Sequence, residues 1–326
     1  MESDVLKALP DNPPNNKLST STQPEQVLAA VRKSGYPLQT RVANLLRTDG
    51  FLLQEEWSYG DPQAESLRAL DVLAQKHLYD REMHPQPRAR PILSLLIECK
   101  QSDLPYIFFA GAKTRLQTFP VFAGLFGDRI SISTDDSRST WSCGIAQVLS
   151  LHTLPFTYDD PIFCMTFSKC VRKGKELELS GSEPFQSLVL PLVKSIRHLQ
   201  KHVAPPKTAH YHDCHLVLGI AVLDAPMLLA EVGGDDCQLT LAPWVRVVRY
   251  EAVDGVHEFD RSQSYGIDVI HKDYLSLFLN EKVMPFGQLF SERALKHDVE
   301  LATGKGFATG MEKDGWLEIH TRLMRK

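Results

Sequence analysis

Apolar and polar residues follow a strand-like pattern through the first third of the chain. Four apolar runs come in succession: Phe51–Tyr59, Ser66–Leu78, Pro91–Gln101 and Tyr106–Ala110. Tyr79–Arg90, rich in proline and charge, separates the second run from the third and predicts a hairpin loop. Before the first run, apolar residues recur at helical spacing from Leu38 through Val42 to Leu46. The pattern predicts a helix followed by strands.

Three charged residues interrupt the second and third runs: Asp71, Glu98 and Lys100. Strand side chains alternate between two faces, so Glu98 and Lys100 share a face with Leu96, whereas Cys99 points to the other face. A hairpin centred between residues 84 and 85 would place Asp71 opposite Glu98. Their Cβ atoms would then lie about 4.5–5.5 Å apart.

Two carboxylates this close among apolar residues repel each other and are poorly hydrated, so at least one would take up a proton if left alone. A hard divalent cation removes the conflict, and carboxylate oxygens suit Mg²⁺ or Mn²⁺. A neighbouring lysine can hold a phosphate oxygen or orient a water molecule. These residue types therefore favour metal-assisted chemistry on a phosphate ester.

Asp71 followed by Glu98-Cys99-Lys100 on the next strand resembles the PD-(D/E)xK nuclease superfamily. The resemblance implies a restriction-endonuclease-like α/β core: a helix, three antiparallel strands, a second helix and further strands. It implies that Asp71, Glu98 and the backbone carbonyl of Cys99 bind Mg²⁺ or Mn²⁺, with Lys100 beside them. Gln39 stands on the first helix where the family often has an acidic residue. The implied reaction is phosphodiester hydrolysis, on DNA rather than RNA, with defence against foreign DNA in bacteria as an analogy.

The rest of the chain is expected to extend this core into a mixed central sheet flanked by helices. Residues 1–24 are expected to be a disordered lead-in, residues 25–225 the core, and residues 226–326 an α/β extension packed on it. Cys214–Val222 is apolar enough for a strand buried on both faces. Glu183–Val203 predicts a helix kinked at Pro191. Arg129–Trp141 is expected to be irregular, and Gly287–Leu301 a helix.

Composition limits the possible partners and location of the protein less closely than the motifs do. The chain has 326 residues, 43% hydrophobic and 23% charged, with a net charge of −4, so any nucleic-acid surface must be a local basic groove. Six irregularly spaced cysteines and no signal peptide indicate a reducing cytoplasm. The longest apolar run, Leu216–Leu223, is too short to cross a membrane.

Basic residues cluster at Lys169–Lys175, at Lys194–Lys201, and at Lys113 with Arg115. They could follow a phosphate backbone, although such runs are usually solvated faces.

Several alternatives remain open. Asp71, Glu98 and Lys100 could form a surface ion-pair cluster. His210, His212 and Cys214 could hold zinc, but no second Cys/His pair follows at finger spacing. The chain could also be an inactive scaffold or sensor that binds nucleic acid or a protein. Finally, it could act only with a partner subunit, as a homodimer, or with a small activating ligand.

Overall fold

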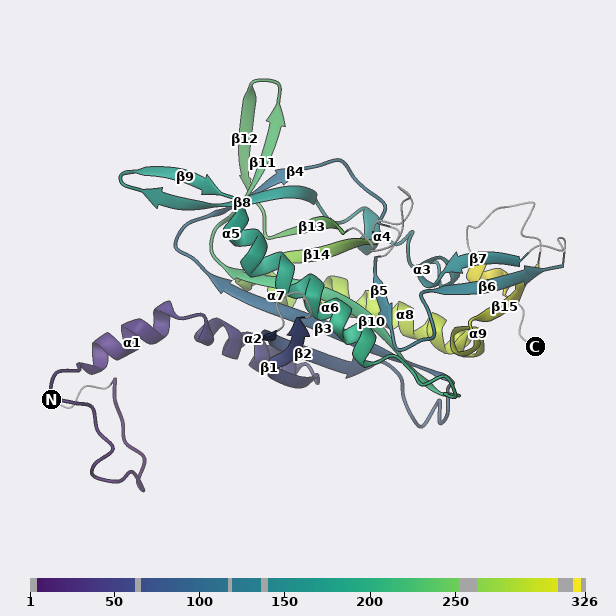
Figure 1. The fold of residues 1–326 in the computed structure, drawn as a ribbon, viewed down its shortest axis with the longest axis horizontal. Helices are drawn as coiled ribbons and strands as arrows, with labels where there is room; N and C mark the ends of the chain where they lie inside the picture. The colour runs from purple at the N-terminus through teal and green to yellow at the C-terminus, as the bar shows by residue number, and fades with distance from the viewer. Residues whose placement is uncertain are drawn as a thin grey trace.

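The computed structural model describes residues 5–61, 66–116, 119–135, 140–251, 263–309 and 319–323. Within these residues one large mixed sheet of twelve strands forms the centre of the molecule, and a three-stranded sheet lies at one end (Figure 1). The strands are β1 (Leu52–Asp61), β2 (Ser66–His77), β3 (Ala89–Gln101), β4 (Tyr106–Ala110), β5 (Val121–Ala123), β6 (Arg129–Thr134), β7 (Thr140–Gly144), β8 (Phe163–Lys173), β9 (Glu176–Ser180), β10 (His212–Asp224), β11 (Met227–Gly233), β12 (Asp236–Leu241), β13 (Trp244–Glu251), β14 (Gln263–His271) and β15 (Lys305–Ala308).

The large sheet begins with the antiparallel meander β1–β2–β3. β10 joins β3 in parallel and β14 joins β10 in parallel, after which β13, β8, β4, β11 and β12 complete the order. The β2–β3 hairpin has the predicted register, because Val72 pairs with Ile97 and His77 with Ile92. β10 is buried on both faces, as its apolar run predicts. The hairpins β8–β9 and β11–β12 project from the sheet (Figure 1).

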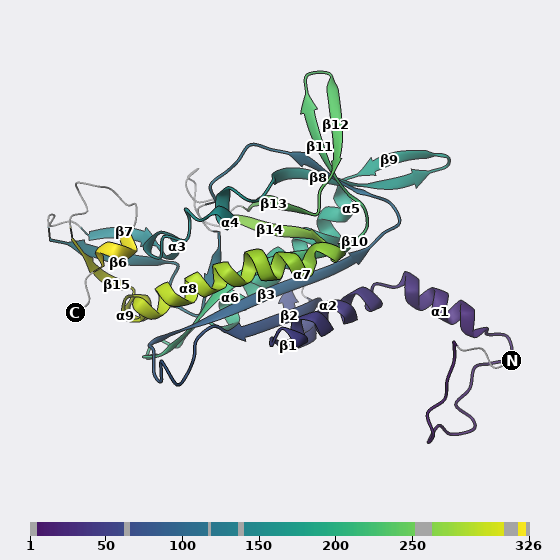
Figure 2. The ribbon, with the colours of Figure 1, turned by 180° about the vertical axis from the view of Figure 1, so that it is seen from behind.

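Helices cover both faces of this sheet. The helices of the described residues are α1 (Pro24–Lys33), α2 (Tyr36–Thr48), α3 (Ile145–Val148), α4 (Pro155–Tyr158), α5 (Ser182–Pro184), η1 (Phe185–Val189), α6 (Leu190–His202), η3 (Lys272–Tyr274), α7 (Leu275–Phe278), η4 (Leu279–Val283), α8 (Met284–Lys296), α9 (Asp298–Thr303) and α11 (Ile319–Arg322). α6 crosses one face (Figure 1), whereas α2, α7 and α8 lie along the other (Figure 2). The predicted mixed sheet flanked by helices is therefore confirmed.

Alternation along β3 explains the two layers of core. Leu93, Leu95, Ile97 and Cys99 pack with residues of α2, α7 and α8, whereas Leu96 packs with residues of α6. A strand that buries both faces must be apolar at successive positions, and β3 is buried from Pro91 to Cys99. The charged residues Glu98 and Lys100 fall at the end of this buried run.

Two predictions on local structure were wrong. The stretch Arg129–Trp141 is not irregular over its first half, because Arg129–Thr134 forms β6 with alternating buried residues. The helix expected at Gly287–Leu301 starts earlier, with α8 at Met284, and His297 separates it from α9. The expected disturbance near Pro191 takes the form of a π-helical turn, η1, directly before α6.

The structure also bears on the expected organisation of the chain. Residues 5–23 contain no regular helix or strand, and α1 buries none of its residues. The large sheet contains strands from both sides of residue 225, where the core was expected to end. β10, which precedes this residue, pairs with β3 on one side and with β14, which follows it, on the other. No helix in the described ranges is long and apolar enough to span a membrane.

Candidate active site in the split sheet

The large sheet splits at Asp71 and Glu98. The last pair joining β2 to β3 is Val72 with Ile97. Beyond it, β2 stays with β1 as far as Ser66, whereas β3 stays with β10 as far as Gln101. The two pairs of strands therefore separate, and the next residue on each inner strand, Asp71 or Glu98, lies at the point of separation.

A side-chain hydrogen bond takes over where the ladder ends. The backbone N–H of Cys99 donates to Oδ2 of Asp71, with 2.6 Å between the two atoms. On the same strand, Lys100 forms a short ion pair with Oε1 of Glu98. Asp71, Glu98 and Lys100 thus come together at the split, which is the convergence that the sequence predicted.

Burial shapes the electrostatics of this group. The pKa of Glu98 is raised to about 7, chiefly by burial and also by the charges of Asp71 and Glu56, against the lowering effect of Lys100. The pKa of Asp71 is raised as well, chiefly by burial. Burial lowers the pKa of Lys100, but attraction to Glu98 and Asp71 outweighs it, so the net shift is upward. The group holds negative charge at an energetic cost that a bound cation would reduce.

Gln39 and Glu56 extend the group to a helix and a third strand. Nε2 of Gln39, in α2, donates to Oε1 of Glu56 at 2.9 Å and to the backbone carbonyl of Asp71 at 3.1 Å. Sequence reasoning did not include Glu56. It lies between the pairs Glu55–Val72 and Trp57–Leu70, opposite Asp71, and has a left-handed φ of 51°. A break in strand alternation at Glu55-Glu56 was the available signal, but the backbone turn itself depends on the neighbouring strands.

The donors suit a hard divalent cation. Oε2 of Glu98 is buried and has no hydrogen-bond partner in the described part of the chain, and the whole residue is only 5% exposed. Because N–H and C=O of one strand residue point toward the same neighbour, the N–H of Cys99 directed at Asp71 implies that its carbonyl faces the split. Two carboxylates and one carbonyl are oxygen ligands of the kind that Mg²⁺ takes together with water. The described residues contain no cluster of three or more His, Cys, Asp or Glu side chains that could hold a metal ion.

The other candidate groups of the sequence stand apart from the split. His212 and Cys214 are buried in β10, whereas His210 lies outside the strand and is exposed. Nδ1 of the buried His215 lies 2.9 Å from Oγ of Ser94. Sequence reasoning also did not identify the ion pair between Asp268 and Arg246, whose side chains are both fully buried.

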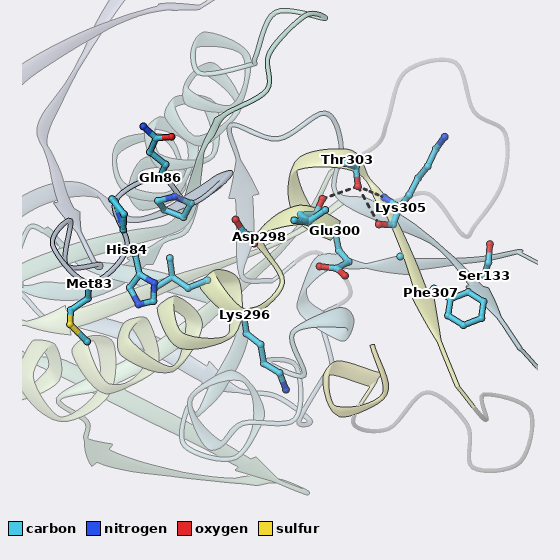
Figure 3. A pocket seen from close by; sticks show the side chains of 15 residues that line it. Met83, His84, Gln86, Ser133, Lys296, Asp298, Glu300, Thr303, Lys305 and Phe307 are labelled. Atoms are coloured by element: carbon cyan, nitrogen blue, oxygen red, sulfur yellow. Dashed lines mark hydrogen bonds between the residues drawn. The ribbon is translucent and has the colours of Figure 1, made fainter. Parts of the chain in front are cut away.

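A large pocket lies elsewhere in the described residues. A pocket of about 880 Å³ lies between the β2–β3 loop, α9 and β15. Its polar groups do not converge on one point: Figure 3 shows the side chains of Lys296 and Lys305 pointing away from each other. Thr303 is occupied in bonds to the backbone of Val299 and Lys305. The split in the sheet, not this pocket, gathers groups able to do chemistry.

Comparisons of the chain with protein-family models, with curated proteins and with solved structures find no match.

Proposed function

We propose that this protein is a Mg²⁺- or Mn²⁺-dependent nuclease with a restriction-endonuclease-like core. The element order supports the proposal: helix α2, the meander β1–β2–β3, helix α6, then β10 parallel to β3, with β4–β9 and short helices inserted between β3 and α6. This is the order that the resemblance implies. The observation that carries the proposal is the convergence of Asp71, Glu98 and Lys100 at the split, with Oε2 of Glu98 left unpartnered among the described residues.

Each side chain has a role that follows from its position. Asp71 and Glu98 would hold the divalent ion, together with the carbonyl of Cys99. The bound ion would supply charge neutralisation at the phosphate and a more acidic water molecule. Gln39 fixes the start of α2 against β1 and β2, so it would hold the water network beside Asp71.

Lys100 has to change partners for this chemistry. Its ammonium now neutralises Glu98, and its side chain is 31% exposed, so it can reach a substrate at the split. Once Glu98 serves as a metal ligand, the ammonium is released to hold a phosphate oxygen or to orient the attacking water. The Glu98–Lys100 ion pair would keep both side chains in place until substrate and ion arrive.

The test is incubation of the full chain with supercoiled plasmid, linear duplex, single-stranded DNA and RNA. Each substrate is tested with Mg²⁺, with Mn²⁺ and with chelator. We expect metal-dependent cleavage of DNA that Lys100→Ala reduces by about 100-fold or more. Lys173→Ala is the matched control, because Lys173 is an exposed lysine on the β8–β9 hairpin. Equal cleavage by wild type and Lys100→Ala, or no metal-dependent cleavage of any substrate, would contradict the proposal.

A second candidate is a non-catalytic scaffold or sensor that keeps the fold and binds nucleic acid or a protein. Two observations favour it: Gln39 is neutral where the family often has an acid, and Lys100 is already paired with Glu98. A rise in melting temperature on adding Mg²⁺, lost in Asp71→Asn, would favour the nuclease. A melting temperature that does not respond to Mg²⁺ would favour the scaffold.

A further inference from the structure

A second cavity lies away from the split sheet, beside the segment that joins β4 to β5. Its volume is about 440 Å³, within the range of small-molecule sites. Arg115, Leu116, Phe119, Arg129, Gly144, Gln147, His152, Thr157 and Tyr158 line it. Sequence reasoning had singled out Lys113 and Arg115 as a basic loop, and the proposed nuclease chemistry makes no use of either.

The charged residues that line this cavity all belong to one class. Arg115 and Arg129 are positively charged, and no Asp or Glu is among the lining residues that the structure describes. The guanidinium of Arg115 lies 5.0 Å from the ring centre of Tyr158 and has no carboxylate partner in the described ranges. Positive groups around one cavity repel each other, and an anion between them would relieve the repulsion.

Some residues of the other basic clusters pair with carboxylates. Lys169 pairs with Glu183, Lys173 with Glu178 and Arg197 with Glu251, at nitrogen–oxygen distances of 3.6, 3.0 and 3.5 Å. Lys113, beside Arg115 in the sequence, pairs with Asp159 at 3.4 Å. Arg115 and Arg129 differ from these residues, because the described part of the chain offers neither a carboxylate.

The basic groups are held in place by neutral partners. Nε of Arg129 donates to Oγ of Ser142 at 2.8 Å. Nδ1 of His152 lies 3.3 Å from the carbonyl oxygen of Ala146, which accepts its hydrogen bond. Burial and, to a smaller extent, the positive charge of Arg115 lower the pKa of His152, against the effect of that hydrogen bond. A carbonyl only accepts, so Nδ1 is the protonated nitrogen of a neutral ring, and the positive charges at the cavity are those of Arg115 and Arg129.

The floor of the cavity is fixed to the central sheet. Arg246 of β13 lies 4.1 Å from the ring centre of Phe119 and donates to the carbonyl of Phe156 at 2.7 Å. Asp268 of β14 holds Arg246 in turn through two hydrogen bonds. The hydroxyl of Thr157 donates to the carbonyls of Leu151 and Leu154. A rigid floor limits the ordering that a ligand would have to impose on binding.

We propose that this cavity binds a small phosphorylated ligand of about nucleotide size, with Arg115 and Arg129 contacting its phosphate groups. The planar, permanently charged guanidinium suits phosphate oxygens, to which it can donate two parallel hydrogen bonds. The amide nitrogen of Gln147 supplies a further donor, because the amide oxygen already accepts from the backbone N–H of Gly144. The site is independent of whether the split sheet cuts nucleic acid.

The test is isothermal titration of the full chain with pyrophosphate, AMP, ATP and adenosine at constant ionic strength. We expect saturable binding of the phosphate-bearing probes and none of adenosine. The double substitution Arg115→Gln with Arg129→Gln should weaken that binding by about tenfold or more. Arg172→Gln with Lys175→Gln removes two exposed charges near the β8–β9 turn and should leave binding unchanged.

Melting temperatures without ligand separate loss of binding from loss of folding, and the single variant Arg115→Gln gives a second route if Arg129→Gln disturbs the β6–β7 pair. The proposal is overturned if no phosphate probe binds saturably, if both double variants weaken binding equally, or if adenosine binds as well as AMP. Binding of a short DNA strand in place of the mononucleotides would also overturn it, because the residues would then be part of a nucleic-acid surface.

Discussion

The large sheet holds two groups of buried charge that satisfy their hydrogen bonds in opposite ways. Arg246 and Asp268, on neighbouring strands, are both fully buried. Arg246 donates to both carboxylate oxygens of Asp268, at 2.8 and 3.1 Å, and Trp244 donates to the same carboxylate. At the split in the sheet, Oε2 of Glu98 is buried without a partner among the described residues. Of the two groups, the one at the split therefore has an oxygen left to bind a ligand.

The difference teaches how to separate structural charge from functional charge within one sheet. A fully bonded buried pair holds elements together, and losing one partner leaves the other uncompensated. A buried carboxylate with a spare oxygen is costly unless something binds it. The positions in the sheet agree with this reading, because Arg246 and Asp268 lie on paired strands whereas Asp71 and Glu98 lie where pairing stops.

The largest effect should come from removing the charge of Asp268. Asp268→Asn leaves Arg246 charged and buried without its counter-ion, so the free energy of unfolding should fall by about 3–5 kcal/mol. Urea unfolding followed by circular dichroism measures the change. Asp71→Asn is the matched control, because the amide oxygen can still accept from Cys99 and the charge was already disfavoured; it should cost less than about 1 kcal/mol. Equal losses in the two variants would mean that both groups are structural.

A third buried ionisable group, His215, should give a smaller effect that depends on pH. Burial lowers its pKa to about 4, against about 6.5 in the unfolded chain. The folded state therefore favours the neutral ring, so this stabilisation is present above pH 6.5 and is lost as pH falls toward 4. The loss should approach about 3 kcal/mol.

Unfolding curves of wild type and His215→Gln between pH 7 and pH 4 measure this contribution. The stability of the variant should fall less steeply over that interval. His210→Gln changes an exposed histidine and should follow the wild-type slope. Parallel slopes for wild type and His215→Gln would show that His215 is not held neutral by the fold.

The smallest effect should come from the backbone at the split. Glu56 has a left-handed φ of 51°, which glycine adopts without strain. Glu56→Gly relieves this strain but removes the acceptor of the Gln39 hydrogen bond, so the free energy of unfolding should change by less than about 1 kcal/mol, whereas Glu55→Gly, at the neighbouring position, should lower it by about 1 kcal/mol. Thermal unfolding of the two variants measures the difference. A loss in Glu56→Gly as large as that in Glu55→Gly would show that the conformation of Glu56 stores no strain.

Local periodicity predicted much of the meander and of the candidate site. Proline and charge in the β2–β3 loop, together with a side-chain period of two, fixed the register that faces Asp71 toward Glu98. The same periodicity identified Lys100 as a neighbour of Glu98. It failed at β6, where polar residues hid an alternation of buried positions, and at α8, whose start did not coincide with Gly287.

By itself the sequence determined which residues carry the candidate chemistry and which strand each one occupies, because hydrophobic alternation is encoded locally. Only the tertiary structure decided that β2 and β3 separate beside the acids, that Glu56 turns out of its strand, and that Arg246 finds Asp268. Those features depend on which distant strands pair and where the pairing ends. Pairing of that kind is governed by packing across the whole sheet, and no stretch of neighbouring residues records it.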